Sequence, residues 1–270
     1  MPIAATNGIE LHYVESGAGP QTIVFAHGLL LDHHMFEAQR LALCKRYRVI
    51  AYDHRGQGDS PPTSGGFDMD TLTDDAAGLI RATGAAPCHF VGLSMGGFVG
   101  MRLAARYPEL LRSLCLLNTS AVAETFIARL RFRAMQAFVG LFGAAPLLPQ
   151  VLPLMFGKSF RNDPARHELL ERWSHHVHSL PRRIVGPVGG VIGRASVLDE
   201  LKYIRCPTLV LTGDEDRTTT PAQAQRIASH ITGARLLCLP VCGHSSSIEA
   251  PAAVTQAIAD FLNGVTEAAI

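Results

Sequence analysis

Apolar and polar residues follow two different periods in the first 118 positions of the chain. Continuous apolar runs, of the kind buried on both faces of a parallel sheet, predict strands at 22–26, 48–52, 88–93 and 110–117. Segments with helical spacing lie between them and predict helices at 32–47, 71–82 and 95–107. Residues 9–16 alternate instead and predict a half-exposed strand. Strands that alternate with helices are typical of the α/β class, in which helices cover a parallel sheet.

The alternation stops near residue 120 and resumes near residue 204. Residues 120–203 are rich in Phe, Leu, Met and Arg, show no strand pattern, and contain six prolines that divide them into short helices. Beyond them the pattern again predicts strands and helices, at 208–212, 221–231, 235–239 and 251–262. We therefore predict a core domain formed by residues 1–119 and 204–270, with residues 120–203 inserted as a helical cap.

Composition argues against several classes of partner and location. The 270 residues carry a formal net charge of +1 and no run of like charges, which disfavours nucleic-acid binding and a polybasic membrane patch. No stretch of about eighteen apolar residues predicts a transmembrane helix, and the N-terminus lacks the pattern of a signal peptide. The six cysteines form no Cys-x-x-Cys pair and indicate no disulfide framework, so we expect a cytoplasmic protein.

A serine lies in a glycine-rich turn between the strand at 88–93 and the helix at 95–107. The pentapeptide Gly92-Leu93-Ser94-Met95-Gly96 is typical of a nucleophile elbow, in which a sharp turn exposes the serine hydroxyl at a helix N-terminus. The turn requires a positive φ at Ser94 and leaves no room for side chains at Gly92 and Gly96. It also directs the Met95 N–H toward charge that develops on a substrate carbonyl oxygen. The pentapeptide by itself equally fits an ordinary α/β turn, so the rest of the chain decides between the two.

Two later strands end in residues that complete the chemistry of a nucleophilic serine. Such a serine needs a histidine as general base and a carboxylate that orients the histidine. The strand at 208–212 is followed by Gly213-Asp214-Glu215-Asp216, and the strand at 235–239 is soon followed by Gly243-His244. Because ligands bind at the carboxyl ends of the strands in such a sheet, we expect these groups to meet Ser94 there. The order serine, acid, histidine is the one described for α/β-hydrolases.

Over nearly its full length the chain resembles the α/β-hydrolase-fold serine hydrolases, and it is most similar to small bacterial carboxylesterases, enol-lactonases and cofactor-free perhydrolases. The resemblance rests on the serine pentapeptide, the Gly-x-x-Asp turn, His27-Gly28 after the first buried strand, the loop 53–60, and Gly243-His244 followed by Glu249 and Pro251. It implies the α/β-hydrolase fold, with a mostly parallel sheet of the eight-stranded type flanked by helices. It also implies an enzyme that needs no cofactor.

The resemblance assigns catalytic roles to three residues. Ser94 is expected to be the nucleophile, and His244 the general base and then the general acid. The family spacing selects Asp216 as the acid that orients His244. Pro221 lies one residue farther from Asp216 than the family pattern, which leaves Asp214 as an alternative.

The oxyanion hole and the substrate pocket involve other parts of the chain. The resemblance places the backbone N–H groups of Leu29 and Met95 in the oxyanion hole, with His27 bracing the loop that carries Leu29. Most apolar residues of the cap are expected to form the cap's own core. A few of them are expected to roof an apolar pocket, and Trp173 is our candidate for its wall.

The sequence predicts no metal site. Adjacent histidines, as in His33-His34 and His175-His176, diverge by about 100° on a helix, and no cysteine or carboxylate completes a ligand set at metal spacing. No Gly-x-Gly-x-x-Gly motif follows the first strand, which argues against a nicotinamide site. The resemblance, together with Ser94, Asp216 and His244, implies a hydrolase of small to medium carboxylic esters or lactones. Perhydrolysis or carbon–carbon bond hydrolysis by the same residues, and a non-catalytic ligand receptor, remain as alternatives.

Overall fold

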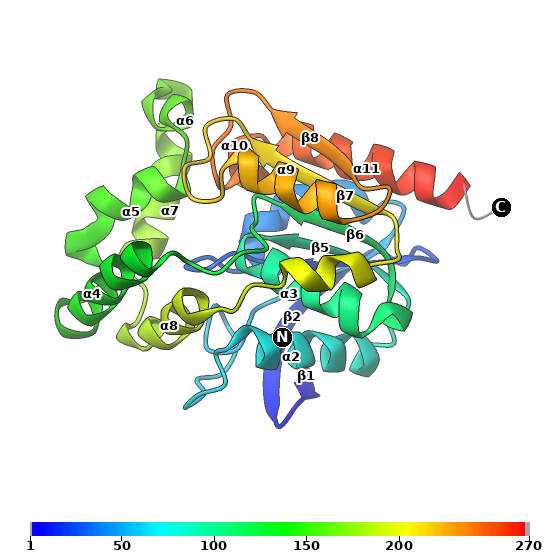
Figure 1. Cartoon of the computed structure of the whole chain (residues 1–270), viewed down its shortest axis with the longest axis horizontal. Helices are drawn as coiled ribbons and strands as arrows, with labels where there is room; N and C mark the ends of the chain where they lie inside the picture. The colour runs from blue at the N-terminus through cyan, green and yellow to red at the C-terminus, as the bar shows by residue number, and fades with distance from the viewer. Residues whose placement is uncertain (1, 268–270) are drawn as a thin grey trace.

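One eight-stranded sheet organises the computed structural model, which describes residues 2–267 (Figure 1). The strands lie in the order β1-β2-β4-β3-β5-β6-β7-β8. Their bounds are β1 (Ile3–Thr6), β2 (Ile9–Ser16), β3 (Thr22–Ala26), β4 (Arg48–Tyr52), β5 (Cys88–Leu93), β6 (Leu111–Leu117), β7 (Thr208–Gly213) and β8 (Arg235–Leu239). The pairs β1–β2 and β2–β4 are antiparallel, and the other five pairs are parallel, which confirms the predicted mostly parallel sheet.

The central strands are apolar along their whole length because both faces of the sheet are covered. Every residue of β3 and of β5 is buried, and the two strands pair in parallel with Val24 opposite Phe90. The edge strand β8 is different, since all of its residues except Leu239 are exposed. The sequence pattern did not predict β1, which has only four residues and alternates between exposed and buried positions.

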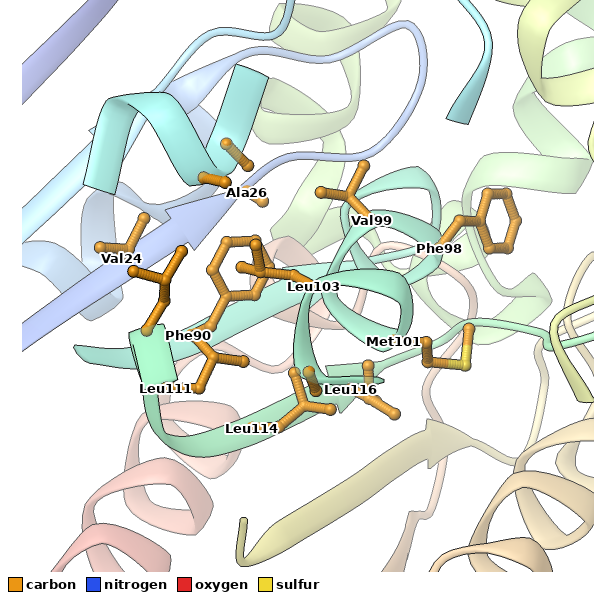
Figure 2. Packing of buried hydrophobic residues seen from close by; sticks show 14 of the residues in the cluster. Val24, Ala26, Phe90, Phe98, Val99, Met101, Leu103, Leu111, Leu114 and Leu116 are labelled. Atoms are coloured by element: carbon orange, nitrogen blue, oxygen red, sulfur yellow. The ribbon is translucent and has the colours of Figure 1, made fainter. Parts of the chain in front are cut away.

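Helices cover the sheet on its two faces. Successive residues of β3 point to opposite faces, so Val24 and Phe25 belong to two separate apolar clusters. The cluster around Val24 includes residues of α2 (Met69–Ala82), α3 (Met95–Arg106) and α9 (Pro221–His230), and the cluster around Phe25 includes residues of α1 (Glu37–Leu43) and α11 (Pro251–Glu267). Figure 2 shows the first cluster, in which Val99 and Leu103 of α3 lie near Phe90 of β5.

Capping side chains determine where two predicted helices begin. The helix expected at 32–47 begins as the 3₁₀ turn η1 (His33–Phe36), where the Asp32 side chain accepts a hydrogen bond from the His34 N–H, and it continues as α1 only to Leu43. Helix α2 begins two residues earlier than predicted, because the Asp68 carboxylate accepts the Thr71 N–H at 2.9 Å and so caps the helix. Two further short elements are η2 (Pro108–Leu110) and α10 (Ser246–Glu249).

The segment between β6 and β7 is helical, and none of its residues lies in a strand of the described chain. Its elements are α4 (Phe126–Phe142), η3 (Ala145–Leu147), α5 (Leu148–Met155), α6 (Lys158–Asn162), η4 (Pro164–Arg166), α7 (His167–His178), η5 (Arg182–Ile184), α8 (Val185–Gly193) and η6 (Leu198–Tyr203). Figure 1 shows α4 to α8 together at one end of the molecule, beside the sheet. The last element, η6, instead packs against α3 of the core and buries Leu201 there. Within residues 2–267, no helix combines the length and the apolar character needed to cross a membrane.

Candidate active site

Ser94 occupies a strained turn between β5 and α3. Its φ of 53° and ψ of −110° lie outside the regions that residues with a Cβ atom prefer. The Ser94 N–H donates to the Leu117 carbonyl at 2.9 Å, and the Gly96 N–H donates to the His27 carbonyl at 3.1 Å. A Cβ atom at Gly92 would lie 2.2 Å from the Gly96 carbonyl oxygen, so glycine is required there. These contacts hold the positive φ that the sequence predicts and place Ser94 at the N-terminus of α3.

His244 is hydrogen-bonded to a buried carboxylate. Its Nδ1 atom lies 2.9 Å from Oδ2 of Asp216. The same carboxylate accepts the backbone N–H groups of Thr218 and Thr219 at 2.8 and 2.9 Å and the Asn118 amide at 2.9 Å. Burial opposes ionisation of Asp216, but the charge of His244 and these hydrogen bonds lower its pKa to about 2. Burial also opposes the charged form of His244, yet Asp216 raises the pKa of its imidazole above 6.5. The carboxylate of Asp216 is therefore ionised where it contacts Nδ1 of His244.

Asp214, the alternative acid, has a different contact. Its Oδ1 atom accepts the Cys242 N–H at 3.2 Å, and no described hydrogen bond joins it to His244. The structure thus brings Asp216 rather than Asp214 to His244.

A second buried carboxylate, Glu249, fixes the loop that carries His244. It accepts the backbone N–H groups of Gly157, Gly243 and Ser245 at 3.0, 2.9 and 3.0 Å. Two of these donors flank His244 in the sequence, and Gly157 lies in the cap between α5 and α6. Burial raises the pKa of the Glu249 carboxyl, and the three N–H groups oppose that shift. In the sequence Glu249 stands out only as part of the family resemblance, because three backbone donors from two distant segments leave no pattern in the chain.

The two backbone N–H groups expected to form an oxyanion hole belong to neighbouring loops. Among the turn, loop and cap hydrogen bonds of the described chain, neither the Leu29 N–H nor the Met95 N–H is a donor. A buried glutamine, Gln57, connects the two loops: its Oε1 accepts the Leu30 N–H at 3.3 Å, and its Nε2 lies 3.7 Å from the Met95 sulfur. This contact could not be predicted from the sequence, since loop 53–60 carries no motif that singles out the glutamine.

His27 braces the loop that carries Leu29. Its Nδ1 lies 2.7 Å from the Gly28 carbonyl, and its Nε2 accepts the His54 N–H at 3.0 Å. These partners require the neutral tautomer with the proton on Nδ1. Burial lowers the pKa of the imidazole and so favours this neutral form. His27 therefore joins three loops around Ser94: its own, loop 53–60 and, through its carbonyl, the serine turn.

Carboxylate and imidazole side chains surround Asp53. This differs from the expectation that no carboxylate would complete a metal-ligand set with His33. Atoms of His12, His33, Asp53 and Asp59 that can ligate a metal all lie within 4.8 Å of one another. That expectation was wrong because β2, η1 and loop 53–60, which are far apart in the sequence, meet here. The His12 and His33 Nδ1 atoms each lie 2.9 Å from Asp53 Oδ2. Burial opposes ionisation of Asp53, but hydrogen bonds from both histidines hold the pKa of its carboxyl well below its usual range. The Asp53 carboxylate, which also accepts the backbone N–H groups of His33 and Asp59, therefore fastens loop 53–60 to η1 and β2.

A cavity of about 190 Å³ brings the candidate residues together. Ser94, His244 and Leu29 line it from the core. Its other walls are mainly apolar side chains of α4, α5 and α8, among them Phe132, Met135, Val139, Val151, Leu154 and Val188. One charged pair interrupts them: Arg194 and Glu124 meet at 2.8 Å, with the guanidinium lying over the Phe98 ring. The cavity thus presents a polar end at Ser94 and an apolar chamber under the cap.

Trp173 is not at the cavity wall. It is only 4% exposed and belongs to the buried cluster that α7 shares with the core. Its ring lies edge-on to His176, and α7 packs against α5, which itself lines the cavity. The tryptophan therefore fills the interior of the cap, and the prediction that it lines the pocket is corrected. Sequence reasoning could not separate the two roles, since both require a large apolar side chain.

Comparison with known proteins agrees with this architecture. A protein family described as alpha/beta hydrolase fold matches residues 21–251. The chain belongs to this α/β-hydrolase family. The 3-oxoadipate enol-lactonase 2 of Acinetobacter baylyi is 28% identical over 93% of this chain and 92% of its own length. A thermophilic esterase from Thermogutta terrifontis has a structure that superposes with a TM-score of 0.89 at 34% identity, covering 97% of each chain. The enol-lactonase of Burkholderia xenovorans LB400 superposes with a TM-score of 0.89 at 32% identity, covering 97% of this α/β-hydrolase and all of that chain.

Proposed function

We propose that this α/β-hydrolase cleaves small to medium carboxylic esters or lactones through an acyl-enzyme on Ser94. The observation that carries the proposal is that Ser94 and His244 line one cavity while His244 is hydrogen-bonded to the ionised Asp216. A strained serine at a helix N-terminus, a histidine and an orienting carboxylate are the parts required for nucleophilic acyl transfer. Relatives that are an esterase and enol-lactonases support esters and lactones as the substrate class.

The proposed reaction proceeds in two halves. Because Asp216 accepts a hydrogen bond at Nδ1, the neutral His244 carries its proton there and leaves Nε2 free to accept the Ser94 proton. The Ser94 Oγ attacks the substrate carbonyl, and the oxyanion lies against the N–H groups of Leu29 and Met95. His244 then gives its proton to the leaving alkoxide, and the ester carbon–oxygen bond breaks. In the second half His244 takes a proton from water, whose oxygen attacks the acyl carbon. The bond from that carbon to Ser94 Oγ then breaks, His244 returns the proton to Oγ, and the carboxylic acid leaves.

Among the hydrogen bonds of the described residues, none joins the Ser94 hydroxyl to the His244 ring. Catalytic hydrogen bonds of this kind are often long without substrate and shorten when substrate binds. The apolar chamber favours acyl or ring groups without charge. The six cysteines are all unpaired, which supports a reducing location such as the cytoplasm.

The test is a substrate panel of p-nitrophenyl esters and lactones of graded acyl length, assayed with the wild type and Ser94→Ala. We expect Ser94→Ala to lower kcat by at least about 10³-fold with an unchanged melting temperature. The matched control is Ser120→Ala, which alters a buried serine that does not line the cavity. Near-normal turnover by Ser94→Ala would refute the mechanism. Analysis of the products distinguishes hydrolysis from transfer to peroxide and from carbon–carbon bond cleavage.

A further inference from the structure

The outer face of α4 is apolar and uncovered. No residue of this 17-residue helix is buried, although most of its side chains are apolar. Phe126 and Ile127 are 81% and 80% exposed, and Leu130, Leu141 and Phe142 are each more than 60% exposed. At about 100° per residue, Phe126, Leu130, Ala134, Ala137 and Leu141 form one stripe along the helix. Figure 1 shows α4 at the outer edge of the cap, on the side away from the sheet. A continuous apolar stripe that is exposed to solvent along a whole helix marks an interaction surface.

Arginines border the apolar stripe on its two sides. By helical periodicity Arg133 lies beside Phe126 on one edge, and Arg131 lies beside Phe142 on the other. Both side chains are exposed, and no described ion pair or hydrogen bond involves either of them. The helix contains no Asp or Glu, and the neighbouring η5 adds the exposed Arg182 and Arg183. An apolar stripe edged by basic side chains is the pattern of a helix that lies in the plane of a membrane surface.

The charge of the whole chain is divided in the same direction. The cap, residues 120–203, contains eleven Lys or Arg and six Asp or Glu, so the remaining residues contain 13 and 17. The net charge of +1 therefore conceals a positive cap on a negative body. This division would attract the cap toward an anionic surface and turn the body away from it. A second copy of the chain fits the stripe less well, because pairing through α4 would bring the arginines of the two copies together.

The inner face of the same helix lines the cavity. Phe132, Met135 and Val139 face the chamber that contains Ser94, and the exposed stripe lies on the opposite side of α4. A helix that is apolar on both faces is normally buried on both. In this structure only the cavity face of α4 is covered. This one helix therefore separates the chamber from any partner that binds to the outer stripe.

We propose that α4 docks on the surface of an anionic phospholipid bilayer, with its apolar stripe between the headgroups and Arg131 and Arg133 on lipid phosphates. Docking places the cap against the lipid, so that an ester dissolved in the bilayer lies next to the helix that walls the chamber. No membrane contact is expected from the sequence alone, because the arginines are separated along the chain and form no run of like charges. The helix brings them to the two edges of one stripe. The docking step does not depend on the proposed hydrolysis, since lipid binding is measured without substrate.

The test is flotation of the full-length protein with vesicles of phosphatidylcholine alone or with about 30% phosphatidylglycerol. We expect the wild type to float with the anionic vesicles at low salt and to be released as salt screens the arginines. Phe126→Ser combined with Leu130→Ser should weaken binding about 100-fold or more, because two exposed apolar side chains no longer enter the interface. Arg131→Gln combined with Arg133→Gln should weaken it about 30-fold.

Two matched double variants control for general changes in surface character. Leu41→Ser with Leu236→Ser removes exposed leucines of the core, and Arg205→Gln with Arg226→Gln removes exposed arginines of the core. Both should bind vesicles like the wild type. Thermal melting verifies folding of every variant independently of activity. Equal flotation with neutral and anionic vesicles, or binding that survives both α4 variants, would overturn the proposal. The proposal would also be overturned if light scattering showed an oligomer in the absence of lipid and Phe126→Ser with Leu130→Ser dissociated it. A second copy of the chain would then cover the stripe.

Discussion

Replacing Asp216 by asparagine tests the orienting role of the carboxylate with minimal change of shape. The Oδ1 atom of Asp216 accepts two backbone N–H groups, from Thr218 and Thr219, and Oδ2 faces the His244 ring at 2.9 Å. An asparagine keeps those backbone hydrogen bonds only with its carbonyl oxygen at the Oδ1 position. Its NH₂ group then lies where Oδ2 was and points at His244. Two donors cannot share that contact, so the ring must present an unprotonated Nδ1.

This change of tautomer blocks the first chemical step. With Nδ1 as the acceptor, the proton of neutral His244 resides on Nε2, and the ring cannot take the proton of Ser94. The variant also loses the charge that stabilises the imidazolium formed during acylation. We expect kcat to fall by about 10⁴-fold, which corresponds to about 5 kcal/mol of transition-state stabilisation. KM should change little, because Asp216 does not line the cavity.

The assay is the steady-state hydrolysis of the best p-nitrophenyl ester for the wild type, Asp216→Asn and Asp214→Asn. Asp214 is the matched control: it lies two residues away, and its Oδ1 atom accepts the Cys242 N–H without contacting His244. We expect Asp214→Asn to retain kcat within about fivefold, because a neutral amide still offers a carbonyl oxygen to that N–H. A loss smaller than about tenfold in Asp216→Asn would contradict the reasoning. A larger loss in Asp214→Asn than in Asp216→Asn would transfer the orienting role to Asp214.

Three further predictions concern the supports of the site. Gln57→Leu should lower kcat about tenfold with unchanged KM, because the Leu30 N–H loses its acceptor and the adjacent oxyanion donor, the Leu29 N–H, is less well placed. A change in KM alone would contradict this role. Glu249→Gln leaves at least one of three buried N–H groups without an acceptor. The free energy of unfolding should therefore fall by about 2 kcal/mol and Tm by about 6 °C. The control Glu215→Gln, at a partly exposed carboxylate, should change Tm less. The base must be neutral, so kcat/KM should fall as pH drops through the raised pKa of His244. Its midpoint should lie above 6.5 in the wild type and move lower in Asp216→Asn, as a pH–rate profile would show.

The parts of the fold that the sequence predicts are those that one local requirement determines. A strand covered on both faces must be apolar throughout, and β3 and β5 satisfy this at every position. The serine turn requires glycine where a Cβ atom would meet the backbone, as at Gly92 and Gly96. In both cases the constraint and the residues that meet it lie within a few positions of each other. Periodicity and a pentapeptide were therefore sufficient to place Ser94 at the carboxyl end of a central strand.

The parts that the sequence could not predict depend on contacts between distant segments. Glu249 binds backbone N–H groups in two segments, and backbone donors impose no residue type that a pattern could reveal. Trp173 has a side chain that fits a pocket wall as well as the interior of the cap, and only the packing of α7 decides between the two. The sequence shows that α4 is apolar around most of its circumference, but not that its outer face lacks a cover. In each of these cases the burial or the contacts of a side chain depend on how distant segments of the folded chain pack together.

The division of the site between core and cap explains how one arrangement of residues can act on different substrates. Ser94, Asp216 and His244 follow the ends of β5, β7 and β8, and the sheet fixes their relative positions through its parallel register. The chamber walls come instead from α4, α5 and α8, and α4 has no buried residue that would fix its side chains. Substitutions in α4 can therefore reshape the chamber at little cost to the core. Relatives near 30% identity that share the fold but include both an esterase and enol-lactonases are what such a division predicts. The acyl preference of this protein should accordingly follow α4, α5 and α8, and exchanging these helices with those of a relative should transfer it.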